Sequence, residues 1–104
     1  MAFLLFYVTH PDEATARQIA TQMVERRLAA CANIFPISSA YWWNGAVQQE
    51  NEWVSVLKTR PELEMRLEET IRQIHPYDVP CILRFEVRAN GDYEKWIVDS
   101  TTLF

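Results

Sequence analysis

Hydrophobic positions along the chain follow the two-residue period of β-strands in several segments. Phe3 to Val8 is apolar on both alternating faces, which is typical of a central strand covered on both sides. From Ala32 to Arg60 the pattern is strand, turn, strand, and Asn44-Gly45 at the pivot predicts a type I′ hairpin turn. Val79 to Val87 predicts a fourth strand, with one face formed by Val79, Cys81, Leu83, Phe85 and Val87.

Two further segments have the 3.6-residue period of helices. The first runs from about Pro11 to Ala29, with Pro11 at the first helical position and Arg26 and Arg27 complementing the helix dipole near its end. Its expected buried stripe is Ala16, Ile19, Ala20, Met23, Val24 and Leu28. A second helix follows Pro61 and ends at His75-Pro76, because proline disfavours continuation.

The C-terminal segment adds a short helix. Asn90-Gly91-Asp92 supplies a turn and a cap, and the helix includes Tyr93, Trp96 and Ile97. The complete order is therefore β-α-β-β-α-β with an added helix, which predicts an α+β chain of the ferredoxin-like class in a single domain over residues 1–104. That motif places both main helices on one face of an antiparallel sheet and leaves the other face open.

The long hairpin has a concentration of aromatic residues, Tyr41, Trp42, Trp43 and Trp53, which we expect near its tip. Both arms are about twice the usual strand length of roughly five or six residues, so the tip should project beyond the sheet. Folding back onto the chain's own core is one alternative, but the adjacent Trp42 and Trp43 must point to opposite faces of a strand. We therefore expect these rings to form an interface between identical copies in a closed ring.

Composition and charge exclude some classes of function. The 104-residue chain has a net charge of −4 with scattered Lys and Arg, which argues against a nucleic-acid partner. The apolar start "MAFLLFYV" lacks a basic n-region and is too short for a membrane span, so we expect no membrane association and a cytoplasmic location. Cys31 and Cys81 are too few for a disulfide scaffold and lack CxxC spacing.

Several separated motifs resemble the CutA divalent-cation tolerance family over nearly the full length. They are "YVT" near the start, "RRLAACANIFPISSAYWWNG" (Arg26 to Gly45), Glu52, Lys58-Thr59, "HPYDVP" (His75 to Pro80) and "YEKWI" (Tyr93 to Ile97). The resemblance implies a homotrimer joined through its long hairpins, an association with copper and other divalent metals, and an architecture similar to PII signalling trimers. It implies no established enzymatic reaction. Cys81 departs from the glutamate that the family often has there.

The resemblance makes Cys31 and His75 candidate metal ligands. A thiolate suits soft ions such as Cu(I), and a neutral imidazole suits many transition metals. The alternative for Cys31 is a small buried core residue, and for His75 a helix C-terminal residue that bonds the last free carbonyls. In this fold the two residues lie at opposite ends of the sheet, so one chain should not bring them to one ion. The same separation makes a Cys31–Cys81 disulfide improbable.

Glu50 and Glu52 lie on one face of the third strand, where paired carboxylates could hold a hard cation or act as acid and base. Glu50 is more simply a solvated residue, whereas Glu52 matches a family position and is a candidate metal ligand or a structural ion-pair partner. We expect Glu52 to lie in a cleft near Lys58, Tyr77 or Trp96. Lys58-Thr59 could bind a small anion, and the alternative is an ordinary pair at the end of a strand. The sequence lacks catalytic motifs such as GxGxxG, Walker or HExxH, so we expect no enzyme.

Three functions are compatible with these patterns. The leading hypothesis is a cytoplasmic homotrimer that binds copper or another divalent metal ion and takes part in metal tolerance. The alternative is a PII-like trimeric sensor that binds a small anionic metabolite in clefts between subunits. A third is a scaffold that positions a partner protein.

Overall fold

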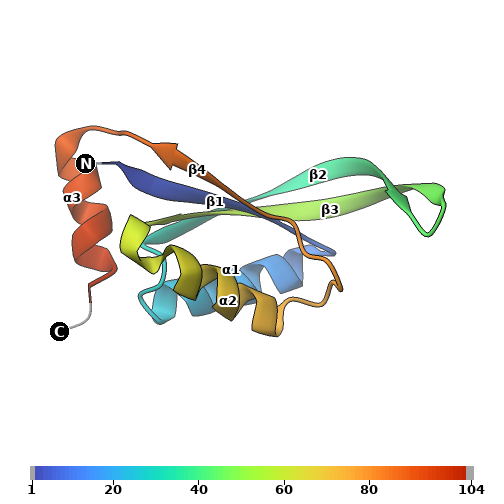
Figure 1. Ribbon diagram of the computed structural model, residues 1–104, viewed down its shortest axis with the longest axis horizontal. Helices are drawn as coiled ribbons and strands as arrows, with labels where there is room; N and C mark the ends of the chain where they lie inside the picture. The colour runs from blue at the N-terminus through green and yellow to red at the C-terminus, as the bar shows by residue number, and fades with distance from the viewer. Residues whose placement is uncertain (1, 103–104) are drawn as a thin grey trace.

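The computed structural model describes residues 2–102, and its elements alternate as the sequence predicts (Figure 1). In chain order they are β1 (Phe3–His10), α1 (Glu13–Glu25), β2 (Cys31–Trp43), β3 (Ala46–Thr59), the 3₁₀ turn η1 (Pro61–Leu63), α2 (Glu64–Ile74), β4 (Ile82–Val87) and α3 (Gly91–Ser100). The four strands form one sheet in the order β2-β3-β1-β4, and all neighbours are antiparallel. This confirms the α+β class and the ferredoxin-like βαββαβ order with an added C-terminal helix.

β1 is the central strand because it pairs with both β3 and β4. Its alternate residues Leu4, Phe6 and Val8 are buried in the main core, which α1 and α2 cover from one side (Figure 1). Leu5 and Tyr7 on the opposite face are only half-buried. The sequence predicts that β1 is covered on both faces. Within one chain the helices cover one face completely, and the open face is covered only in part.

The β2-β3 hairpin extends far beyond the rest of the sheet (Figure 1). β2 and β3 have 13 and 14 residues, against 8 in β1 and 6 in β4. β1 pairs with β3 only as far as Trp53, so residues 46–52 pair with β2 alone. At the tip Asn44 and Gly45 have φ angles of 51° and 78°, which confirms the type I′ turn.

The tip aromatic rings are exposed in the single chain. Trp42 is 74% exposed, Trp43 44% and Tyr41 36%, so the alternative in which these rings fold back onto the chain's own core is wrong for this subunit. The placement of Trp53 near the tip is also wrong. Trp53 pairs with His10 and Pro36, which puts it where the hairpin leaves the four-stranded sheet, and it is half-buried there.

Helix α1 ends at Glu25, earlier than the predicted Ala29. Arg27 has a φ of 61°, a left-handed conformation that reverses the chain, and the Leu28 amide bonds back to the Met23 carbonyl at 2.9 Å. Arg26 and Arg27 therefore lie outside the last turn and do not complement the dipole as expected. The reversal still buries Leu28 and Ala29 in the core, which explains why the hydrophobic pattern continues beyond the helix.

Strand β4 begins at Ile82 rather than Val79, because residues 75–81 form a loop that includes Pro76 and Pro80, neither of which has an amide hydrogen to donate. Leu83 and Phe85 are exposed on the open face of the sheet. Arg84 points the other way: it bonds Glu64 and Glu68 of α2 and lies 4.9 Å from the Phe6 ring centroid. The apolar face predicted for β4 is thus the open face.

The longest helix of the described chain, α1, has 13 residues, and within residues 2–102 no helix combines the length and apolar character needed to cross a bilayer.

Candidate functional site

The candidate residues divide between the two ends of the sheet. At one end Cys31 pairs across the strands with Lys58, which in turn pairs with Leu5. At the other end the His75 ring bonds the Thr9 carbonyl. Glu52 lies at this end too, because its neighbour Trp53 pairs with His10. The expected separation of Cys31 and His75 within one chain agrees with this geometry.

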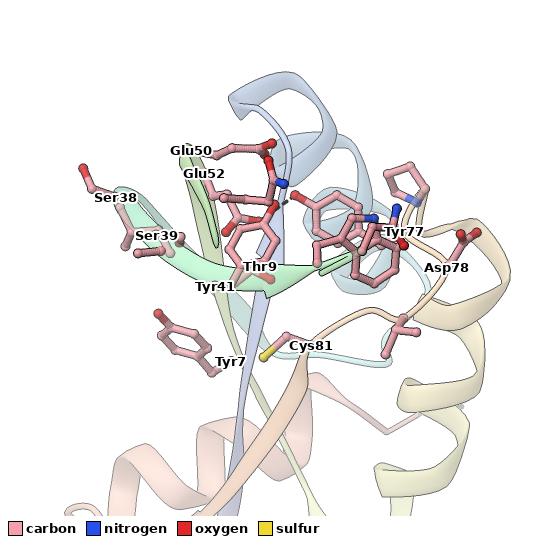
Figure 2. Close-up of a pocket in the computed structure, with 17 residues that line it drawn as sticks. Tyr7, Thr9, Ser38, Ser39, Tyr41, Glu50, Glu52, Tyr77, Asp78 and Cys81 are labelled. Atoms are coloured by element: carbon pink, nitrogen blue, oxygen red, sulfur yellow. Dashed lines mark hydrogen bonds between the residues drawn. The ribbon is translucent and has the colours of Figure 1, made fainter. Parts of the chain in front are cut away.

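Glu52 and Tyr77 form a direct pair at the hairpin end. The Tyr77 hydroxyl donates to Glu52 Oε2 at 2.6 Å, and only 6% of Glu52 is exposed (Figure 2). Burial, followed by the bond to Glu52, raises the pKa of Tyr77 far above its ordinary value, so its hydroxyl remains a donor. Of the three neighbours proposed for Glu52, the structure selects Tyr77; Lys58 and Trp96 lie at the opposite end.

His75 is fully engaged by the protein itself. Its Nε2 lies 2.7 Å from the Thr9 carbonyl oxygen, and its Nδ1 accepts from the Tyr77 amide at 3.1 Å. Because a carbonyl can only accept, Nε2 must bear the ring hydrogen, which fixes the tautomer. Burial lowers the pKa of His75, so the ring is neutral. Neither nitrogen is available to a metal without breaking one of these bonds.

His10 is a buried polar residue that the sequence reasoning missed. It is fully buried, its Nε2 lies 2.7 Å from Ser55 Oγ, and its ring stacks on His75 at 5.3 Å between centroids. Nδ1 is the buried side-chain atom that has no hydrogen-bond partner within residues 2–102. Burial, reinforced by His75, lowers the pKa of His10 to about 4. The strand period was the available signal, since His10 continues the buried series of Leu4, Phe6 and Val8.

Cys31, Lys58 and Trp96 gather around Tyr93 at the other end of the sheet. Lys58 Nζ donates to Tyr93 Oη at 3.2 Å, and Cys31 Sγ lies 3.6 Å from the same oxygen. Since that oxygen accepts from Lys58, its own hydrogen is free to point at the sulfur. Trp96 stacks on Tyr93 at 5.6 Å between centroids and stays exposed.

A hollow of about 1040 Å³ lies on the open face beneath the hairpin, and Glu52 forms part of its wall (Figure 2). We call it the acidic hollow; its walls include Tyr7, Tyr41, Trp43, Glu50, Glu52 and Tyr77. Cys81 also lines it, and burial, together with the Glu52 carboxylate, raises the pKa of the Cys81 thiol. The chain's two cysteines therefore sit in different surroundings, and both are free.

The three proposed metal ligands do not form one site in the single chain. His75 and Glu52 lie at one end of the sheet, both bonded to Tyr77, and Cys31 lies at the other. Among residues 2–102 no group of three or more His, Cys, Asp or Glu side chains converges to hold an ion. A transition metal normally takes about four protein ligands in a structural site and three in an open one. One copy therefore offers single donors rather than a formed metal centre.

The chain is similar to known proteins along nearly its whole length. Residues 4–100 match the family described as "CutA1 divalent ion tolerance protein". The divalent-cation tolerance protein CutA of Pyrococcus horikoshii is 39% identical over 99 residues, covering 94% of this chain and 97% of the relative. The protein of the same name from Thermotoga maritima is 40% identical over 98 residues, covering 93% and 97%.

Solved structures agree with the sequence comparison. The crystal structure of divalent ion tolerance protein CutA1 from Ehrlichia chaffeensis superposes with a TM-score of 0.93 at 36% identity, covering 97% of this chain and 96% of that one. CutA1 from Oryza sativa also gives a TM-score of 0.93 at 36% identity, covering 98% and 95%. Fold, motifs and identity coincide over the same residues, and the chain therefore belongs to the CutA1 divalent ion tolerance family.

Proposed function

We propose that this protein takes part in tolerance to divalent cations, that it works as a homotrimer, and that it binds transition-metal ions, copper among them. Family membership over residues 4–100 is the observation on which the proposal rests, because the relatives are named for divalent-cation tolerance. The proposal assigns no chemical reaction to the protein.

Exposed apolar surface supports self-association. Trp42 and Trp43 at the hairpin tip, together with Phe35, Leu83 and Phe85, remain exposed in the single chain. A projecting two-stranded ribbon gains little stability alone, and large rings on it favour an interface.

Cys31 is the donor best suited to copper. Cys31 is half-buried, and its sulfur lies next to the Tyr93 phenol, which also accepts from the Lys58 ammonium group. His75, by contrast, uses both ring nitrogens within the protein. Thiolates bind Cu(I) in preference to harder ions. Glu52 is a hard oxygen donor and suits Cu(I) less well. Because one chain offers single donors, further ligands must come from neighbouring copies.

Equilibrium dialysis of the assembled protein against Cu(I) under anaerobic conditions tests this assignment. We expect Cys31→Ala to lower copper affinity at least tenfold, because the soft donor is lost, and His75→Ala to leave it within twofold. Cys81→Ala is the matched thiol control, since burial and Glu52 keep that thiol protonated. Equal copper binding by the wild type and all three variants would remove Cys31 from the proposal.

A second candidate is a PII-like sensor of a small anionic metabolite, and Lys58 favours it. Within residues 2–102 no ion pair includes Lys58, whose ammonium group donates to the Tyr93 hydroxyl. Thermal unfolding with panels of dicarboxylates and phosphate esters, without metal, tests this function. A true ligand at a hundredfold excess over its Kd should add about 2.7 kcal/mol of stability. Lys58→Gln should abolish the shift, and an unchanged shift in that variant contradicts the assignment.

We also propose a cytoplasmic location, because both cysteines are free thiols. A solved relative from Archaeoglobus fulgidus, 33% identical, is described as a periplasmic divalent cation tolerance protein. Cell fractionation with an antibody against this chain decides between the two compartments.

A further inference from the structure

The positive charge of Lys58 lies beside the proposed copper ligand. Cys31 of β2 and Lys58 of β3 are directly opposite each other in the antiparallel pair. Cross-strand partners of this kind have Cβ atoms roughly 4.5–5.5 Å apart. Both side chains also reach the same atom, because Lys58 Nζ lies 3.2 Å and Cys31 Sγ 3.6 Å from the Tyr93 hydroxyl oxygen. The ammonium nitrogen and the sulfur therefore cannot be farther apart than the sum of these two short distances.

Tyr93 of α3 keeps the two groups together. Its ring packs edge-on against Phe3, with 6.2 Å between ring centroids, and stacks on Trp96 at 5.6 Å. Figure 1 shows α3 at the end of the sheet where β1 begins, which is also the end where β3 finishes. All of these contacts are made within one chain. The closeness of the ammonium group to the sulfur therefore does not depend on how copies of the chain associate.

A fixed ammonium group acts differently on metal ions of different charge. A monovalent and a divalent ion bind the same sulfur, so the repulsion by Lys58 differs between the two ions by one elementary charge. The sulfur alone does not make this choice, because thiolates bind Zn(II) as well as Cu(I). At an effective dielectric constant of about 20, two charges about 7 Å apart interact strongly enough to change an affinity more than tenfold.

We propose that Lys58 is a specificity-determining residue of the Cys31 site, and that it favours monovalent soft ions over divalent soft ions. The inference rests on the proposed copper binding at Cys31 and adds the charge of the ion that this sulfur takes. Cu(I) meets both requirements, because it is soft and has a single charge. The divalent ions in the family's name are then not the preferred ligands of this sulfur.

Titration of the assembled protein with Ag(I) and with Cd(II), in chloride-free buffer of low ionic strength, tests the proposal. The two ions are isoelectronic and both bind thiolates, so charge is the main difference between them. Every protein in the series carries Cys81→Ala, which leaves Cys31 as the single thiol of the chain. We expect Lys58→Gln to shift the ratio of the Ag(I) and Cd(II) affinities at least tenfold toward Cd(II), because the divalent ion gains more from the loss of the positive charge.

Two variants separate charge from other effects. Lys58→Arg keeps the positive charge and should leave the affinity ratio within threefold. Lys95→Gln removes a positive charge from an exposed position on α3, where Lys95 pairs with Asp99, and should change the ratio less than twofold. Added salt should reduce the effect of Lys58→Gln, because salt screens charges that are partly exposed.

Three results overturn the proposal. One is an equal affinity ratio with lysine and with glutamine at position 58, while binding of both ions still requires Cys31. Another is a shift in Lys58→Arg as large as the shift in Lys58→Gln, which would assign the effect to packing rather than to charge. Both of these results leave the proposed copper binding at Cys31 unaffected. The third is unchanged binding of both ions after Cys31→Ala, which contradicts the proposed copper binding as well.

Discussion

Replacing Trp42 and Trp43 together by alanine is expected to convert the assembled protein into monomers at micromolar concentration. The two rings are 74% and 44% exposed in the single chain and point to opposite faces of β2. Truncating a tryptophan at the centre of an interface typically costs about 2 to 4 kcal/mol, so the pair should raise the dissociation constant at least a thousandfold. Sedimentation velocity over a dilution series measures the change.

The control for this experiment is Met65→Ala, since Met65 is an exposed apolar residue on α2, on the helical side of the sheet. It should leave the assembly intact. Trp53→Ala is a different test, because Trp53 lies at the base of the hairpin and packs within the sheet. An intact trimer of the double variant at nanomolar concentration, or a wild type that is monomeric, would show that the tip rings do not form the interface.

Replacing His10 by glutamine is expected to remove most of the loss of stability between pH 7 and pH 5. Burial lowers the pKa of His10 from 6.5 to about 4, so the folded chain keeps the ring neutral in this range while the unfolded chain takes up a proton. Stability therefore falls as pH drops through 6.5 and stops falling below about 4. At 1.36 kcal/mol per pKa unit, the wild type should lose about 2 kcal/mol between pH 7 and pH 5 through this residue.

Urea or guanidinium unfolding gives the free energy of unfolding of each protein at pH 7 and at pH 5. Because the two values are subtracted within each protein, a change in stability that the glutamine causes at both pH values cancels. His75→Gln is the control, because His75 is the only other histidine and its pKa is lowered for the same reason. It should flatten the dependence less than His10→Gln does. Three carboxyl groups also have lowered pKa values: Asp12, Glu68 and Glu94. Their contribution to folding stability is lost mainly below pH 5, outside the range compared here. An unchanged pH dependence in His10→Gln would contradict a neutral buried ring.

Local patterns predicted much of the fold because they act over a few residues. Asn44-Gly45 set the turn, the two-residue period set the long hairpin, and His75-Pro76 ended α2. The boundaries that failed depend on contacts outside the segment. Arg27 adopts a left-handed conformation so that Leu28 can enter the core, and its side chain bonds the Ser100 carbonyl, 73 residues away.

The candidate site was predicted only in part. Topology separated Cys31 from His75, and Glu52 was correctly associated with Tyr77, but sequence could not choose Tyr77 over Lys58 and Trp96. His10 was missed because its role depends on Ser55 and His75, both of them far along the chain. Hydrogen bonds of this kind form between segments that only the folded sheet brings together.

The sequence by itself determined the order of elements, the length of the hairpin and the aromatic character of its tip, because hydrophobic period and turn chemistry are local properties of the chain. Only the tertiary structure decided which polar groups meet. It placed Glu52 on Tyr77, engaged both nitrogens of His75, and gathered carboxylates and rings into the acidic hollow. The physical reason is that hydrogen bonds and electrostatic fields depend on distances of a few ångströms between residues whose separation along the chain says nothing about their separation in space.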